Sequence, residues 1–138
     1  MTNRHAVTVR SICMLYGLFA VYIPHAFAND SPKYVVSMVD LIVRGDQFVD
    51  HRVEVFGYLA STGGLHLYLT KDHANAMDTA SSILVSDTDN GDIHNSSCMS
   101  SYVTVSGVLV ELEPGIVGLV SVESIFQQSS QDFCLQHK

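Results

Sequence analysis

Two stretches of the chain alternate apolar and polar positions in the same way, and both carry the pattern Val-x-Val-x-Gly-x-Leu. The first lies within His51–Leu59 and the second within Ser101–Leu109. Because successive side chains of a β-strand point to opposite faces, the valines and the leucine of each stretch share one face. Glycine inside a strand is typical of a bulge or a sharp bend, as at a barrel corner. Gly57 and Gly107 therefore predict two bent, half-buried strands of a small closed β-barrel.

Apolar runs bounded by turn residues predict five strands in all. Ser61–Gly64 predicts a hairpin turn because glycine accepts a positive φ, and Glu113–Ile116 places proline second and glycine third, as a type II turn requires. Imperfect alternation around Ser124 and Ile125 indicates a bulge in the last strand. The expected strands are Arg52–Leu59, Leu65–Leu69, about Ser82–Ser86, Tyr102–Leu112 and roughly Val117–Phe126.

Segments outside the strands have other patterns. Tyr34–Arg44 is apolar at spacings of three, one and three, which fits one face of a helix that begins at Ser31-Pro32, although its valines leave a strand open. We expect Lys71–Thr79 to be a short helix or a loop. Residues 87–100 are polar and are expected to be a loop, and residues 127–138 a polar tail.

The N-terminal 28 residues have the features of a secretory signal. Arg4 and Arg10 form a positive region, residues 11–23 an apolar region, and Ala26-Phe27-Ala28 fits the rule for signal peptidase cleavage. The alternative is an uncleaved membrane anchor, but an apolar run of this length is short of the roughly 20 residues that span a bilayer. We expect a cleaved signal peptide at 1–28, one domain at 29–138, no stable membrane span and a periplasmic or secreted protein.

Removal of the signal makes the protein strongly acidic. The seven Lys and Arg include Arg4 and Arg10, so five remain against all fourteen Asp and Glu, and the formal net charge becomes −9. Such a charge disfavours nucleic acid and anionic membranes and favours a basic partner, although it also serves solubility alone. We expect a protein partner and no nucleic acid.

Cys98 and Cys134 remain after cleavage, and two cysteines in a small exported domain predict a disulfide. A hairpin of the last two strands would turn near residue 116, midway between them. Residues equidistant from the turn of an antiparallel hairpin lie opposite each other, which brings the two cysteines together.

The order of these elements resembles small exported bacterial OB-fold proteins of poorly defined function. The resemblance covers residues 34–126 and is carried by the helical segment and four short motifs. These are Val-Glu-Val-Phe-Gly-Tyr-Leu, Leu-His-Leu-Tyr, Ser-Ile-Leu-Val and Tyr-Val-Thr-Val-Ser-Gly-Val-Leu. It implies a mainly β fold, a five-stranded OB-like closed or partly open barrel with an N-terminal helix and one disulfide. The helix usual between the third and fourth OB strands is not visible.

No catalytic motif occurs, and we expect a protein that is not an enzyme and holds no cofactor or metal. The histidines of the domain are scattered, and no Ser or Cys has the context of a nucleophile. A zinc site of the cysteines with histidines lacks ligand pairs at zinc spacing. Asp87–Asp92 has the alternating carboxylates of a calcium loop, but its glycine falls one position early, and a plain surface loop is favoured.

The strand period predicts an aromatic binding face. If Val53, Val55 and the leucines of Leu65–Leu69 point into the barrel, then the residues between them point outwards. We expect a contact surface made by Phe56, Tyr58, His66 and Tyr68. The alternative is that the N-terminal helix or the Lys71–Thr79 segment covers these rings.

Three functions fit this outline. The first is a non-catalytic exported binding module that acts by protein–protein contact, such as an inhibitor or immunity-type protein. The second is a glycan or small-ligand binding OB-fold protein, which rests on fold analogy. The third, binding of single-stranded nucleic acid by aromatic stacking, is opposed by the charge and the export signal. The sequence leaves the identity of the partner and the oligomeric state open.

Overall fold

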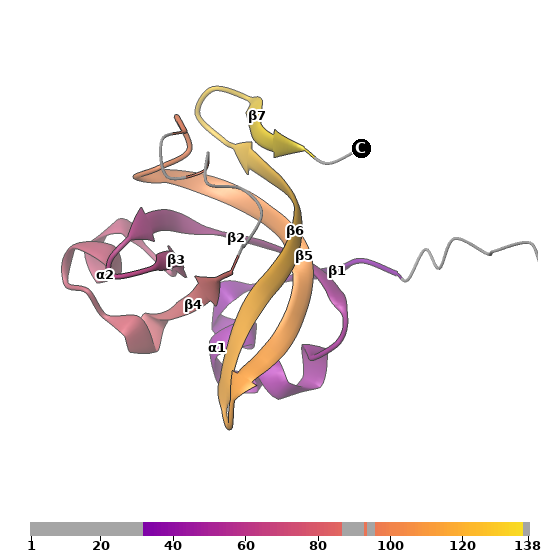
Figure 1. The fold of residues 1–138 in the computed structure, drawn as a ribbon. Coiled ribbons are helices and arrows are strands. Elements are labelled where there is room, and N and C mark those ends of the chain that lie inside the picture. The colour runs from indigo at the N-terminus through magenta and orange to yellow at the C-terminus, as the bar shows by residue number, and fades with distance from the viewer. Residues whose placement is uncertain (1–31, 87–92, 94–95, 137–138) are drawn as a thin grey trace, which may run out of the picture.

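All strands of the described residues belong to one sheet, which closes on itself as a ring (Figure 1). The computed structural model describes residues 32–86, 93 and 96–136. The strands are β1 (Tyr34–Val36), β2 (Arg52–Ser61), β3 (Leu65–Tyr68), β4 (Ser82–Val85), β5 (Ser101–Glu113), β6 (Ile116–Gln127) and β7 (Asp132–Gln136). The helices are α1 (Met38–Arg44), α2 (Lys71–Asn75) and the 3₁₀ turns η1 (Gly45–Phe48) and η2 (Thr79–Ser81).

The five predicted strands form the ring, so the expected mainly β fold is confirmed. β2 pairs with β3, β3 with β4, β4 with β6, β6 with β5, and β5 pairs again with β2. Every contact in this circuit is antiparallel except β4–β6, which is parallel. β1 and β7 are additional strands that extend the sheet outside the ring, against β2 and β6 respectively.

The strand period correctly predicts the inner face of the ring. Val53, Val55 and Leu59 of β2 are buried, and so are their counterparts Val103, Val105 and Leu109 of β5. These side chains belong to a single core that the other ring strands and α1 complete. The burial of these apolar side chains in the core is the main source of stability, since removing apolar surface from water drives folding.

The two glycines of the repeated pattern, which predicted bends or bulges, lie at a close approach of two strands and at a register irregularity. A Cβ atom at Gly57 would lie 2.7 Å from the carbonyl oxygen of Tyr68, so β2 can approach β3 this closely only without a side chain there. Gly107 lies where the β5–β6 register shifts between Ser106 and Val108. The extra residues of this irregularity are on β6, next to the predicted bulge at Ser124.

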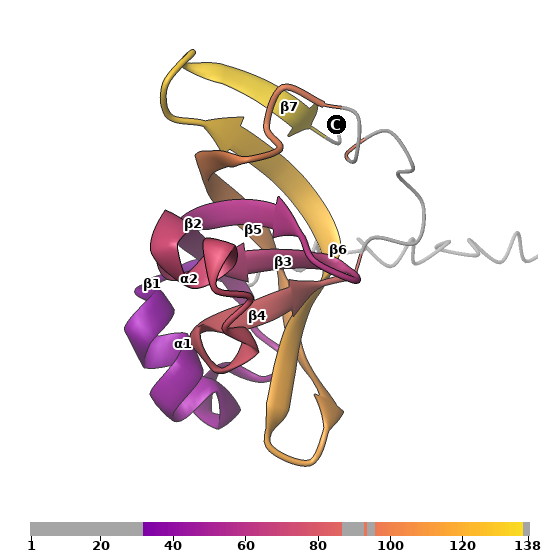
Figure 2. The same ribbon diagram turned by 90° about the vertical axis from the view of Figure 1, so that its left-hand side faces the viewer.

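The N-terminal segment differs from the prediction because it combines both alternatives. Residues 34–36 form β1, which pairs in parallel with β2, and the helix begins only at Met38. The predicted start at Ser31-Pro32 is wrong because Ser37 is the N-cap: its hydroxyl oxygen accepts a hydrogen bond from the Asp40 backbone N–H. α1 lies at one end of the ring and buries Met38 and Leu41 in the core (Figures 1 and 2).

The C-terminal segment is not a polar tail, which corrects the prediction for residues 127–138. After a turn at residues 128–131 the chain reverses, and β7 pairs antiparallel with β6. The rings of Phe126 and Phe133 meet across this pair with centroids 5.0 Å apart. Phe133 thus packs on Phe126, a contact that the polar residues 128–132 before it did not predict.

The predicted Cys98–Cys134 pair is confirmed, with the two Cα atoms 6.0 Å apart. The route differs from the expected hairpin symmetry, because Cys134 lies on the returning strand β7 and not on a continuation of β6. Cys98 is buried in the turn that precedes β5.

The predicted signal at 1–28 and the Asp87–Asp92 loop lie outside the described residues. In the described part of the chain, no helix combines the length and apolar character needed to cross a membrane.

Candidate functional site

The predicted aromatic face is divided by the fold, and two of its four residues are buried. Tyr68 has no exposed surface and Tyr58 only 7%. Both pack with Ala60 and with Ala74, a residue of α2. The two aromatic side chains point out of the ring of strands as the period requires, but α2 covers them. An exposed binding role for Tyr58 and Tyr68 is therefore wrong, and the alternative, coverage by the 71–79 segment, is correct.

Polar contacts explain why α2 lies over these tyrosines. The Thr70 hydroxyl oxygen accepts a hydrogen bond from the His73 backbone N–H and so caps the helix at its start. The backbone N–H of Lys71 donates to the hydroxyl oxygen of Tyr102 at 3.3 Å. The Tyr68 hydroxyl is hydrogen-bonded to the hydroxyl of Thr62. The hydroxyls of Tyr68 and Tyr102 thus each have a hydrogen-bond partner, as buried or partly buried polar groups require.

Phe56 remains exposed and is joined by a ring that the strand pattern did not identify. It stacks on Tyr102 with centroids 5.6 Å apart and planes 12° apart, and 51% of Phe56 and 39% of Tyr102 remain exposed. Directly paired residues of neighbouring strands share a face of the sheet. Phe56 pairs with Thr104, Thr104 with Phe126, and Phe126 with Phe133, so the outer face carries an aromatic row: Phe56, Tyr102, Phe126 and Phe133.

Three members of the aromatic row were missed from the sequence. Phe126 follows Ile125, which points inwards and is fully buried, so the period alone could have placed Phe126 outside. Phe133 lay in the presumed tail, and only the pairing of β7 places it beside Phe126. The row is apolar, while nearby polar groups are bound to one another: Gln128 donates its amide N–H to the Thr104 hydroxyl oxygen, at 2.8 Å.

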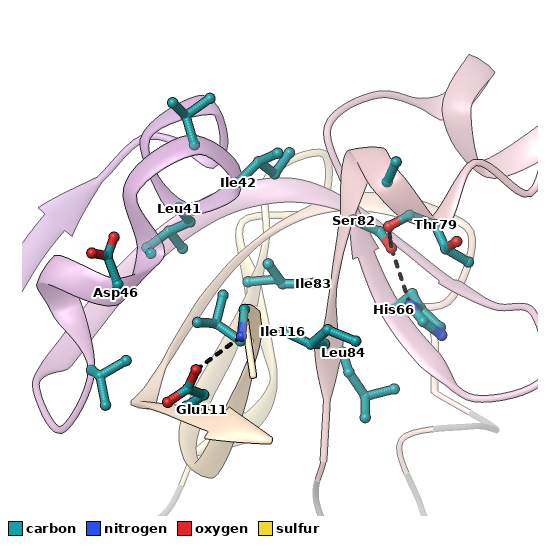
Figure 3. A pocket seen from close by; sticks show the side chains of 16 residues that line it. Leu41, Ile42, Asp46, His66, Thr79, Ser82, Ile83, Leu84, Glu111 and Ile116 are labelled. Atoms are coloured by element: carbon teal, nitrogen blue, oxygen red, sulfur yellow. Dashed lines mark hydrogen bonds between the residues drawn. The ribbon is translucent and has the colours of Figure 1, made fainter. Parts of the chain in front are cut away.

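His66, the fourth predicted residue, lies elsewhere, in an apolar cleft of about 560 Å³ (Figure 3). The end of α1 with η1 forms one wall, β4 and η2 another, and the tip of the β5–β6 hairpin the third. Figure 3 shows Leu41, Ile42, Ile83, Leu84 and Ile116 around it.

The titratable groups that line the cleft are two carboxylates and one imidazole, and Thr79 and Ser82 add two hydroxyls. Asp46 and Glu111 lie at its margin, and a Glu111 carboxylate oxygen accepts a hydrogen bond from the Gly115 backbone N–H at 2.9 Å. His66 Nδ1 is 3.1 Å from the Ser82 hydroxyl oxygen. Burial disfavours the charged imidazolium and lowers the pKa of His66 below its ordinary value.

No arrangement typical of a metal centre is found among residues 32–86, 93 and 96–136. Within these ranges, no three His, Cys, Asp or Glu side chains lie close enough to hold a metal ion together.

No protein-family model matches the chain, and neither a curated protein nor a solved structure matches it. The candidate sites are thus two surfaces suited to contact, the aromatic row and the apolar cleft.

Proposed function

We propose that this protein is a non-catalytic exported binding module that acts by protein–protein contact through the aromatic row. One observation carries the proposal: rings from β2, β5, β6 and β7 gather on the outer face of the sheet, and half of Phe56 and half of Phe133 remain exposed. Aromatic side chains are enriched at the centres of protein interfaces, where they bury large areas at a small cost in conformational entropy.

An OB-like barrel is the fold that we propose for this module. The circuit β2-β3-β4-β6-β5-β2, with its single parallel contact, supports it, because a five-stranded closed arrangement is the OB pattern. The Cys98–Cys134 pair supports export, since disulfides persist in oxidising compartments. The acidic charge supports a basic partner, as an inhibitor or immunity-type protein would have.

Glycan binding is the second candidate, and the geometry of one ring pair favours it. The parallel stacking of Phe56 on Tyr102 leaves part of each ring accessible, and aromatic faces also stack on the apolar faces of sugars. The two candidate functions differ in the contact area that each would need on this surface. A protein partner needs about 800 Å² from this side, hence the whole row, whereas one sugar needs only one ring.

The test is affinity capture from a periplasmic extract with the exported protein as bait. We expect one partner to be retained by the wild type and lost from a Phe56→Ala, Phe133→Ala double variant. The control is Met77→Ala, which removes an apolar side chain that is more exposed than either ring and does not belong to the row. Retention of the partner by the double variant would refute the role of the row, and binding of glycans on an array without any protein partner would favour the second candidate.

A further inference from the structure

We propose that the apolar cleft is a second binding site, which accepts an apolar side chain from a protein segment that has Lys or Arg next to it. The cleft is separate from the aromatic row. Val117 and Ile116 line the cleft at the beginning of β6, whereas Phe126 of the row lies near its end. The inference stands on the cleft alone and does not require the row to bind anything.

The floor and walls of the cleft are apolar and held in place by the core. Leu41 and Ile83 at its floor belong to the main core and are almost fully buried. A Cβ atom at Gly45 would lie 2.8 Å from a methyl carbon of Val117, so the end of α1 rests directly on β6. A volume of about 560 Å³ is within the range of pockets that hold several apolar groups. The cavity is thus formed by fixed elements.

The exposed margin favours a protein segment as the occupant. Val43 of α1 and Ile116 of the hairpin tip line the cleft from opposite sides, and both are more than half exposed. Apolar surface therefore continues from the cavity onto both lips. An extended chain that inserts one side chain and lies across the lips would cover this surface, as single-side-chain anchors do in peptide recognition.

The charge at the margin selects a basic segment. The residues lining the cleft include Asp46 and Glu111 but neither Lys nor Arg. The nearest cation along the chain, Arg44, is bound to Asp40 one helical turn away. Burial lowers the pKa of His66 and so disfavours its charged form, and none of the described residues that line the cleft is a Lys or Arg to offset the two carboxylates. A second copy of this acidic chain would bring like charges together, whereas Lys or Arg beside the inserted side chain would be attracted.

The experiment is an NMR titration of the ¹⁵N-labelled exported protein with three capped hexapeptides at low salt. One alternates Lys with Leu, one Lys with Ser, and one Glu with Leu. We expect the Lys/Leu peptide to shift the amide signals of Ile42, Asp46, Leu84 and Val117 with a Kd at least about tenfold below those of the other two peptides. Equal binding of the Glu/Leu peptide would show that the cleft does not prefer basic peptides. Equal binding of the Lys/Ser peptide would show that the cavity does not require an apolar side chain. Either result, or no shift at the cleft, overturns the proposal.

A double variant tests whether the two carboxylates at the cleft attract the basic residues of the peptide. Asp46→Asn with Glu111→Gln should weaken the Lys/Leu peptide by roughly threefold for each charge removed. Gln keeps an amide oxygen that can accept the Gly115 hydrogen bond, so the hairpin tip is preserved. The matched control is Asp72→Asn, an exposed carboxylate on α2 that does not line the cleft. An equal loss in this control would attribute the effect to overall charge and refute the site.

Discussion

At the scale of single residues, Tyr68 and Phe56 both point out of the ring, yet they have opposite environments. Tyr68 is fully covered and Phe56 is half exposed. We expect Tyr68→Ala to lower the free energy of unfolding by about 3–5 kcal/mol, since a large buried ring leaves a cavity. Phe56→Ala should cost about 1 kcal/mol or less, because it loses only the stacking on Tyr102.

Urea unfolding of the two variants measures this difference. Phe56→Ala serves as the control for Tyr68→Ala, because both remove an outward-pointing ring from a neighbouring ring strand. Similar losses in the two variants would mean that α2 does not cover Tyr68 in solution.

His66 gives a prediction for the pH dependence of stability. An unperturbed histidine has a pKa of 6.5, and burial lowers the pKa of His66 in the folded protein. On acidification the unfolded chain therefore binds a proton first, so the free energy of unfolding should fall between about pH 6.5 and the folded pKa. Below the folded pKa this contribution levels off.

The measurement is an NMR titration of the imidazole signals, with urea unfolding of the wild type and His66→Gln at several pH values. The variant lacks the titrating group, so its stability should depend less steeply on pH in this window. Titration of His66 at or above pH 6.5 would contradict the prediction.

At the scale of elements, β7 is an edge strand outside the ring, and the disulfide ties it to the turn before β5. Cys98 and Cys134 are 36 residues apart, and closing a loop of this length stabilises a protein by about 2–4 kcal/mol. We expect Cys98→Ala with Cys134→Ala to lower the stability by this amount. The ring strands should remain folded, because the circuit that closes the ring does not pass through β7, which pairs only with the outer edge of β6.

Hydrogen exchange locates the effect. Amides of residues 132–136 should lose protection in the double variant, while those of β2 and β5 keep most of theirs. Uniform loss of protection over the whole sheet would instead show that the ring and β7 open as one unit.

At the scale of the whole molecule, we expect export with cleavage after Ala28. The positive start, the apolar stretch and Ala26-Phe27-Ala28 support this, and the acidic domain that follows would then begin at Asn29. Intact-mass measurement of the exported protein tests the prediction. A Phe27→Lys variant alters only the middle position of the cleavage motif and should still be cleaved, whereas Ala28→Leu should block cleavage. A wild-type mass that includes residues 1–28 would refute it.

The sequence by itself determined which residues form the interior of the ring and where its five strands lie. Alternation is a property of strand geometry, so the local pattern around Val53 and Val103 is sufficient to orient each strand. The turns at Gly63 and Gly115 are equally local, because each glycine has a positive φ that few other residues adopt. The cysteine pair followed from composition, although the hairpin symmetry behind it did not hold.

Only the tertiary structure decided which outward-pointing side chains are exposed. Coverage of Tyr68 depends on α2, the aromatic row depends on the return of β7 to β6, and the cleft depends on α1 meeting β4 and the hairpin tip. Each is a contact between segments that no short period of residues connects. A local pattern orients a side chain relative to its own backbone, but the packing of distant segments determines what lies above it.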